Sequence, residues 1–139
     1  MAQKNGANHK INSANTDVAQ RIIELTNGEK VDAAFEAVGI SDTVGYTIAA
    51  IKKGGELTLV GNVQKNIEFP LQHVVTNEIN INASCASSGE YANCIKLINS
   101  GKIDLDDIVS KTAPLSEGGK WFEKLHAGLP GVIKVVLIP

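Results

Sequence analysis

Apolar residues near the start of the chain recur at the spacing of a helix. Between residues 15 and 28 they fall three or four positions apart, so they share one helical face. Thr16 or Asp17 can cap the first turn, and Gly28 can end the last one. The apolar face consists of Val18, Ile22 and Leu25. The first predicted element is therefore an amphipathic helix.

A strand, a helix and a second strand are predicted next. The mostly apolar run over residues 31–38, with Asp32 and Glu36 as exceptions, indicates a strand covered on both faces. Helical spacing returns over residues 41–53, and residues 57–60 form another short apolar run. This order of elements is usually solved by two parallel strands joined through a right-handed crossover. The sequence therefore predicts an α/β fold.

The rest of the chain continues this alternation. Residues 79–84 alternate Ile with Asn, as a strand does, and residues 88–101 predict a helix with Tyr91, Ile95 and Ile98 facing inward. The pattern over residues 106–111 is ambiguous. The final elements are a helix over 116–127 around Phe122 and Leu125, and a strand over 131–138. We expect one domain over residues 1–139, with a partial nucleotide-binding unit over 1–87 and carboxy-terminal helices and a closing strand over 88–139.

Composition narrows the classes of function. Lys and Arg total 13 against 15 Asp and Glu, and these charges are interspersed, which argues against nucleic acid and membrane surfaces as partners. The two cysteines do not form a disulfide framework, and no apolar run reaches the length of a membrane span. We expect a reduced cytoplasmic protein in which Cys94 packs as a small apolar residue on its helix.

Glycines follow two of the predicted strands. Gly39 comes after the strand over 31–38, and Gly61 comes after the strand over 57–60. Ligands of doubly wound sheets bind outside the carboxyl ends of the strands, where a glycine lets a flat ligand approach the backbone. The alternative, which spacing alone favours, is that each glycine serves only a tight turn. Both interpretations remain open.

The strings around these glycines resemble a known family. VDAAFEAVG over residues 31–39 and KKGGELTLVGN over 52–62 resemble the zinc-type medium-chain dehydrogenases, in particular the sorbitol, threonine and other polyol dehydrogenases. NGANHKINS near the start and GVIKVVLIP at the end extend the resemblance over essentially the whole chain. The zinc-free quinone reductases are an alternative branch, against which the Glu in FEAVG weighs. The resemblance implies an incomplete Rossmann-type parallel sheet with flanking helices that lacks the first two strands.

The resemblance also implies a set of cofactor-binding residues. Residues after the strands over 31–38 and 57–60 would approach the riboses and nicotinamide of NAD or NADP. Main-chain groups after the strand over 79–84 would hold the carboxamide. Lys134 would reach the pyrophosphate, although a solvated lysine on an edge strand is equally compatible. The residues carried over are Ala37, Val38, Gly39, Val60, Gly61, Asn62, Ser84, Cys85, Ala86 and Lys134.

Other parts of the family's site have no counterpart in the sequence. GxGxxG and the acidic residue that discriminates the ribose are missing, and the three histidines are far apart in sequence. We therefore expect zinc only in an amino-terminal part outside this chain, no catalytic or metal-binding residue here, and weak or absent NAD or NADP binding. The alternative is a free-standing α/β module that binds a small ligand or a protein without catalysis.

A sheet without its first two strands has an exposed edge. The third strand of the classical order, around residues 9–12, would lose its neighbour, and the strand over 31–38 would expose an apolar edge. A missing amino-terminal half or a second copy could cover it. We favour a third solution, in which residues 9–12 pair directly with the strand over 31–38.

Overall fold

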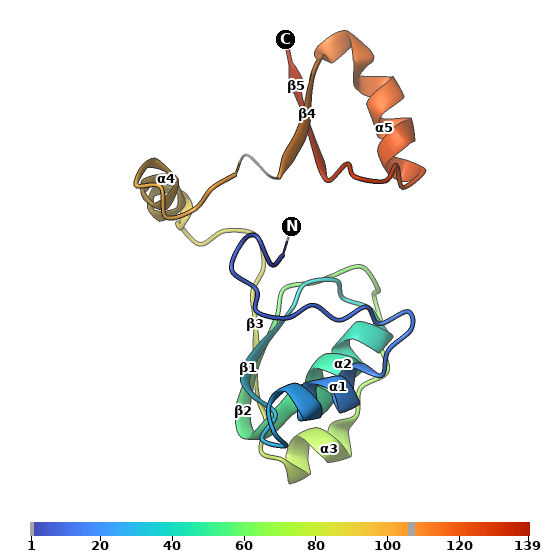
Figure 1. Cartoon of the computed structure of the whole chain (residues 1–139), viewed down its shortest axis with the longest axis vertical. Coiled ribbons are helices and arrows are strands. Elements are labelled where there is room, and N and C mark those ends of the chain that lie inside the picture. Colours follow the sequence, from blue (N-terminus) through green and yellow to red (C-terminus); the bar gives the residue numbers. More distant parts are fainter. Residues whose placement is uncertain (1, 106–107) are drawn as a thin grey trace. The chain divides into compact units, whose positions relative to one another are not determined.

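The chain forms two compact units. The computed structural model describes residues 2–105 and 108–139, and these divide into units over residues 2–86 and 87–139. Each unit is an arrangement of helices beside parallel strands (Figure 1).

Unit 2–86 alternates helices and strands in the order that the apolar pattern predicts. It contains α1 (Val18–Leu25), β1 (Val31–Glu36), α2 (Ser41–Ala50), β2 (Ile51–Leu59), α3 (Leu71–Thr76) and β3 (Asn80–Ala83). The short helix α3 has no counterpart among the predicted elements. It begins after Pro70, a residue that fits a helix start because it has no N–H to satisfy.

The three strands form one parallel sheet in the order β1-β2-β3. Glu36 is the Cα partner of Leu59, and Leu59 is the Cα partner of Ala83, so all three strands end at one level. Both crossovers move in the same direction across the sheet. Because such crossovers are right-handed, they place α2 and α3 on the same face, as Figure 1 shows.

The hydrophobic core lies between this face and the helices. Leu57, on the central strand β2, is completely buried, and Ile48 of α2 belongs to the same buried cluster. Burying a side chain of this size stabilises the fold by about 1.5–3 kcal/mol. The buried cluster consists of Val44, Ile48, Ile51, Leu57, Val74 and Ile79.

The opposite face of the sheet is open, and here the sequence prediction was wrong. Ala33 is exposed, and Phe35 is 76% exposed, although β1 was expected to be covered on both faces. The helices that cover the second face of a doubly wound sheet belong to crossovers running in the opposite direction. The described part of unit 2–86 has no such crossover. On β3 this face carries Asn80 and Asn82, which tolerate water.

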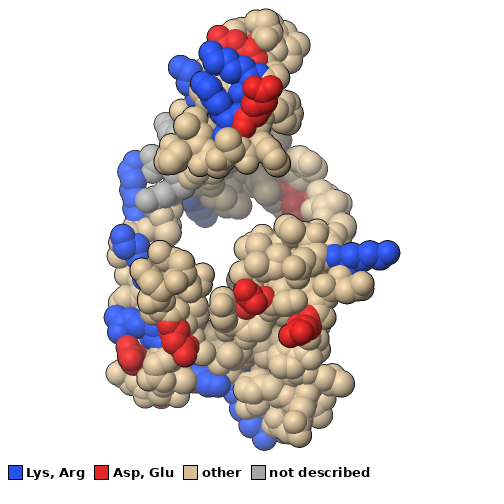
Figure 2. Space-filling model, turned by 90° about the vertical axis from the view of Figure 1, so that its right-hand side faces the viewer, with Lys and Arg blue, Asp and Glu red and all other residues tan. Residues whose placement is uncertain are grey.

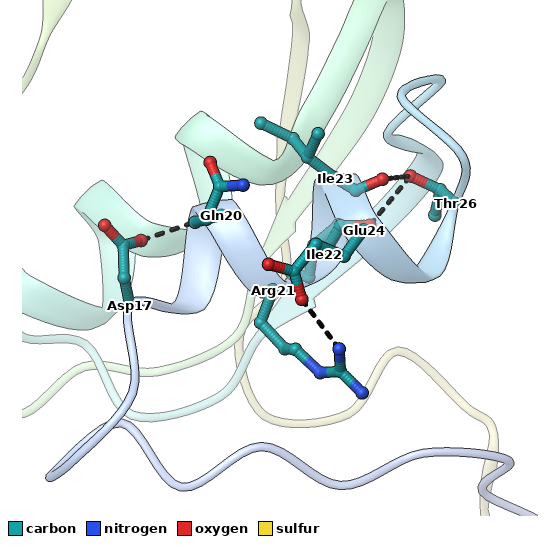
Figure 3. A network of polar contacts seen from close by, with 7 residues as sticks. All are labelled: Asp17, Gln20, Arg21, Ile22, Ile23, Glu24 and Thr26. Atoms are coloured by element: carbon teal, nitrogen blue, oxygen red, sulfur yellow. Dashed lines mark hydrogen bonds and ion pairs between the residues drawn. The ribbon is translucent and has the colours of Figure 1, made fainter.

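Helix α1 is fixed by side chains near both of its ends (Figure 3). Asp17 caps it by accepting a 3.0 Å hydrogen bond from the Gln20 amide. Thr26 Oγ1 donates a 2.8 Å bond to the Ile22 carbonyl after the last turn. The predicted helix and one of its two candidate caps are therefore confirmed.

The segment before α1 forms turns rather than a strand. Residues 9–12 have no strand conformation, so the pairing that we favoured with β1 does not occur. In the described residues β1 pairs only with β2, and its other edge has no strand beside it. The strand prediction failed because a short polar segment forms a strand only where it can hydrogen-bond to a neighbouring strand in the correct register.

Helix α2 ends at Ala50, earlier than the predicted 53. Ile51 instead turns into the sheet, where it pairs with Val31 and is 1% exposed. Gly54 follows with φ of 74°, a left-handed conformation that glycine adopts without strain. Burial of Ile51 therefore outweighs the helical propensity of the two lysines that follow it.

Unit 87–139 is smaller and has little core. It contains α4 (Tyr91–Asn99), β4 (Val109–Pro114), the 3₁₀ turn η1 (Leu115–Glu117), α5 (Gly118–His126) and β5 (Lys134–Ile138). β4 and β5 pair in parallel. Of the ambiguous segment 106–111, residues 106 and 107 lie outside the described residues, and the part from Val109 onward is a strand.

Most apolar side chains of this unit remain in contact with water. Ala113 and Gly118 are its only buried residues among those described. The prediction that α4 packs inward was wrong, because Tyr91 is 73% exposed and Ile95 54% exposed. Cys94 is also exposed, so it does not pack as an apolar core residue. The helical period was correct, but a period cannot show whether another element covers the apolar face.

Charged side chains of both signs appear in each unit. On the face drawn in Figure 2, Lys and Arg side chains lie close to Asp and Glu side chains. Within α1, Arg21 and Glu24 form a 2.7 Å ion pair. This face therefore carries mixed charge.

Candidate cofactor edge

Most of the candidate residues lie at one edge of the three-stranded sheet. Because β1, β2 and β3 are parallel and end at one level, the residues that follow them meet at the same carboxyl edge. We call this the cofactor edge. It contains nine of the candidates, namely Ala37, Val38, Gly39, Val60, Gly61, Asn62, Ser84, Cys85 and Ala86. Lys134 belongs to the other unit, where it is exposed at the start of β5.

Glu36 is the last residue of β1, and its carboxylate is buried beneath this edge. It is only 2% exposed. Its side-chain oxygens accept hydrogen bonds of 2.9 Å from the backbone amides of Val38 and Gly39. Oε1 also accepts a 2.7 Å bond from the hydroxyl of Thr43 in α2. The carboxylate thus folds back over the loop that follows its own strand.

These hydrogen bonds control the ionisation of Glu36. Burial by itself raises the pKa of the carboxyl, because it removes the charge from water. The bonds from Gly39, Thr43 and Val38 act in the opposite direction, and together they hold the pKa below its usual value. Glu36 is therefore a carboxylate at neutral pH.

The main chain of Glu36 reaches the loop after β2. Its carbonyl oxygen accepts bonds from the amide of Val60, at 2.8 Å, and from that of Gly61, at 3.0 Å. The Gly39 carbonyl accepts a further bond of 2.8 Å from the Gln64 amide. The loops after β1 and β2 are consequently joined along their backbones.

The two glycines allow this close approach. A Cβ built on Gly61 would lie 2.2 Å from the Gly39 nitrogen, and one built on Gly39 would lie 2.4 Å from the Asn62 nitrogen. Gly39 also has φ of 83°, in the left-handed region. Both glycines are thus required by contact between two loops, which neither interpretation of the sequence included. Gly39 is buried in this contact, and the side chains of Val38 and Val60 are exposed beside it.

The loop after β3 extends the same edge. The Ser84 amide donates a 2.9 Å bond to the Leu59 carbonyl, which continues the ladder by one residue. Cys85 is exposed, and Ala86 has φ of 54°, an uncommon conformation for a residue with a Cβ. The chain therefore turns sharply where unit 2–86 ends.

Sequence reasoning missed the polar residues that connect the loop after β2 to α2. Gln64 Oε1 accepts bonds from the amide, at 3.0 Å, and the hydroxyl, at 3.3 Å, of Ser41. Ser41 Oγ in turn accepts a 3.0 Å bond from the Glu68 amide. Residues so far apart in sequence gave no local signal. Thr43 could have been suspected, since Thr in a first helical turn often bonds a nearby polar group.

A pocket lies beside this network, between α2 and the segment that leads into α3. Its volume is about 510 Å³, within the range of small-molecule sites. Asp42, Tyr46 and Phe69 contribute to its walls, as does His73, whose Nε2 is buried without a hydrogen-bond partner. None of the residues proposed from the sequence lines this pocket.

The residues of the cofactor edge can be compared with what a nicotinamide cofactor requires. Gly39 and Gly61 pack against each other's loop, and the exposed side chains of Val38 and Val60 beside them offer an apolar surface that suits a planar ring. The amides of Val38, Gly39, Val60 and Gly61 all donate within the chain, so this part of the edge suits the ring better than a phosphate. No group of three or more His, Cys, Asp or Glu that could hold a metal occurs among the described residues.

Comparison with known proteins identifies the family. The profile described as zinc-binding dehydrogenase matches residues 1–100. The chain belongs to this family. It is 28% identical over 137 residues to (R,R)-butanediol dehydrogenase of Neisseria gonorrhoeae, covering 96% of this chain and 38% of that protein. It is 29% identical over 140 residues to sorbitol dehydrogenase of Bacillus subtilis, covering 99% and 39%.

Solved structures confirm the fold. Zinc dependent alcohol dehydrogenase 2 from Streptococcus pneumonia, in its apo form, matches with a TM-score of 0.88 and 31% identity, over 98% of this chain and 40% of that chain. A putative zinc-binding dehydrogenase from Sinorhizobium meliloti, solved with NADP, has the same fold at a TM-score of 0.85 and 22% identity, over 99% and 41%. The chain thus has the α/β, Rossmann-type fold found in zinc-type dehydrogenases.

The family match covers only part of the length of the relatives. The chain spans about two fifths of the length of these relatives, as the 38% and 39% coverages show. It corresponds to part of their cofactor-binding half. In the residues described, no helix combines the length and the apolar character needed to cross a membrane.

Proposed function

We propose that residues 2–86 supply the nicotinamide side of an NAD(P) site in a zinc-dependent alcohol or polyol dehydrogenase, and that this chain alone does not turn over an alcohol. The observation that carries the proposal is the level ending of three parallel strands beneath two loops that pack together at Gly39 and Gly61. Ligands of such sheets bind at this edge. Family membership makes a nicotinamide cofactor the ligand to test first.

Each part of the edge has a proposed role. Ala37, Val38 and Gly39 would lie along the riboses, and the loop over residues 60–62 would contact the nicotinamide ring. Residues 84–86 would meet its carboxamide. Lys134, whose side chain is exposed, would reach the pyrophosphate when the whole dehydrogenase is assembled. When bound, the nicotinamide accepts a hydride, and this chain positions the ring.

Turnover needs groups that we place outside this chain. Zinc-dependent oxidation requires three protein ligands around the metal, and the described residues contain no such group. The phosphate-binding GxGxxG turn is also not in the sequence. We expect no alcohol oxidation by the isolated chain with zinc and NAD present. Measurable turnover of a polyol by the purified chain would contradict this part of the proposal.

The binding part can be tested with the two halves of the cofactor. Nicotinamide mononucleotide, followed by amide chemical shifts, should perturb residues 37–39, 60–62 and 84–86. Adenosine monophosphate should perturb these amides far less, because the turn that binds the adenine side is missing. Any binding of NAD and NADP to this chain should be weak and alike for the two cofactors, since the discriminating ribose site is also missing. A response confined to the pocket beside α2, or a stronger response to adenosine monophosphate, would refute the proposal.

The family relationship and the thiols suggest a location for the protein. Cys85 and Cys94 are both free and both exposed. Exposed thiols persist in a reducing compartment and tend to oxidise outside one. We therefore propose the cytoplasm, which thiol alkylation in fractionated cells would test.

The second candidate is a module that binds a protein partner without catalysis. It is favoured by the exposed apolar side chains of α4, especially Tyr91 and Ile95, because large exposed apolar groups often mark contact surfaces. The partner could be an amino-terminal dehydrogenase half or a second copy of the chain. Sedimentation of the chain with and without Ile95→Lys separates these roles. Self-association that this change abolishes, together with no response to nicotinamide mononucleotide, would favour this candidate.

A further inference from the structure

Among the carboxylates that the structure describes, Glu36 is unusual because it is buried and its hydrogen-bond donors include no cationic side chain. Buried carboxylates are ordinarily paired with a positive side chain or a metal. The donors around Glu36 are instead two backbone amides, of Val38 and Gly39, and the hydroxyl of Thr43. Amides alone can hold a carboxylate ionised when several of them converge on it.

The amides of Val38 and Gly39 form a concave group of the kind that binds anions. Successive N–H groups around a left-handed residue make such a nest, and Gly39 has φ of 83°. Here the chain's own carboxylate fills the nest. The loop after β1 is therefore held in shape from below, and its outer surface is left without these donors.

The same residue holds the neighbouring loop through its main chain. The Glu36 carbonyl accepts hydrogen bonds from Val60, at 2.8 Å, and from Gly61, at 3.0 Å. The side chain thus fixes the loop after β1, and the carbonyl fixes the loop after β2. A shift of Glu36 would move both loops together.

The two loops pack so closely that no side chain fits between their backbones at Gly61. A Cβ on Gly61 would lie 2.2 Å from the Val38 carbonyl carbon and equally close to the Gly39 nitrogen. The shape of the cofactor edge consequently depends on how the loop over 38–39 packs against the loop over 60–62. That packing depends on the Glu36 carboxylate.

We infer that Glu36 is a positioning residue of the cofactor edge, whose carboxylate seats the loop over 38–39 against the loop over 60–62 and so creates the surface that receives the nicotinamide ring. This inference rests on the proposed function. It gives Glu36 no contact with the cofactor. The residue acts through Gly39 and Gly61.

The test compares Glu36→Gln, Glu36→Ala and Thr43→Val, with Glu56→Gln as the matched control. Glu56 lies on β2 in the same sheet, but it is exposed and apart from the loops. Nicotinamide mononucleotide at one fixed concentration is added to each full chain, well below its melting temperature. The shift changes at Gly39 and Gly61 are then measured.

The expected decrease in the ligand-induced shift changes depends on which hydrogen bonds to the Glu36 carboxylate each variant removes. Losing charge-assisted bonds in Glu36→Gln should reduce the ligand-induced shifts about tenfold, and Glu36→Ala should reduce them further. Thr43→Val, which removes one neutral donor to the carboxylate and preserves shape, should reduce them about threefold. The Gly39 amide proton of the free Glu36→Gln chain should move upfield as its carboxylate partner is lost. Glu56→Gln should match wild type.

The outcomes distinguish positioning from a purely structural role. If Glu36→Gln and Thr43→Val lower the melting temperature but respond to the ligand like wild type, Glu36 only stabilises the fold and the inference is wrong. If wild type itself shows no response to nicotinamide mononucleotide, the proposed function fails, and the inference fails with it. If Glu36→Ala does not fold, Thr43→Val alone decides, because it leaves the carboxylate in place.

Discussion

The two units of this chain use the same kinds of element but differ in what those elements cover. In unit 2–86, α2 and α3 lie on one face of a three-stranded sheet and bury a cluster that includes Leu57 and Ile48. In unit 87–139, β4 and β5 form only a two-stranded sheet, and α4 has no buried residue. A right-handed crossover buries a core only when enough strands lie beneath its helix.

The largest expected difference between the units is in amide exchange. The core strands of unit 2–86 should open only by unfolding that unit, whereas α4 should open locally at little cost. We predict that the Leu57 and Ile81 amides exchange about a thousandfold more slowly than those of α4, a difference of about 4 kcal/mol. Amide exchange followed by NMR measures this directly. Equal protection in α4 would mean that a surface we describe as exposed is covered in solution.

A core substitution should affect one unit alone. Leu57→Ala removes a side chain that is 0% exposed and should destabilise unit 2–86 by about 2–5 kcal/mol. The matched change Ile95→Ala, at a site 54% exposed on α4, should cost less than about 0.5 kcal/mol.

Trp121 allows the two units to be followed separately. It is the single tryptophan and belongs to α5, so its fluorescence reports unit 87–139. Leu57→Ala should therefore shift the denaturation curve measured by circular dichroism more than the curve measured by Trp121 fluorescence. Identical shifts in both curves would show that the units unfold as one.

The contact between the glycine loops should be the next most sensitive feature. Gly61→Ala places a Cβ 2.2 Å from backbone atoms, which must move, and should cost about 1–3 kcal/mol. Gly45→Ala is the control, since its Cβ would meet nothing within 4 Å and it lies inside α2. It should stabilise the unit by about 0.5–1 kcal/mol. Urea denaturation of both variants gives the two values, and opposite signs are expected.

The smallest effect that we predict concerns the cap of α1. Asp17→Ala removes the acceptor of the Gln20 amide and should destabilise unit 2–86 by about 1 kcal/mol. Glu123→Ala, an exposed carboxylate inside α5, should change stability by less than about 0.5 kcal/mol. Thermal denaturation followed by circular dichroism suffices. A cap that contributes nothing would indicate that packing of α1 on α2 alone holds this helix.

The sequence predicted where the loops of the candidate site lie, but it did not predict the hydrogen bonds that hold them. Apolar runs ending in Gly39 and Gly61 were enough to place both loops at the carboxyl ends of parallel strands. The role of Glu36 was not predictable in the same way. In the sequence it is a charged exception within an apolar strand, and its partners appear only when Gly39 and Thr43 fold around it.

The sequence by itself determined the period of each main element, the parallel α/β order and the family, because these depend on local spacing and on strings of residues. Only the tertiary structure decided which apolar faces are covered. Residues 9–12 form no strand, and the side chains of Phe35 and Tyr91 are exposed. Ile51, which was predicted in a helix, belongs to the sheet instead. Burial depends on which elements meet in space, and a one-dimensional pattern cannot specify a partner that lies elsewhere in the chain or outside it.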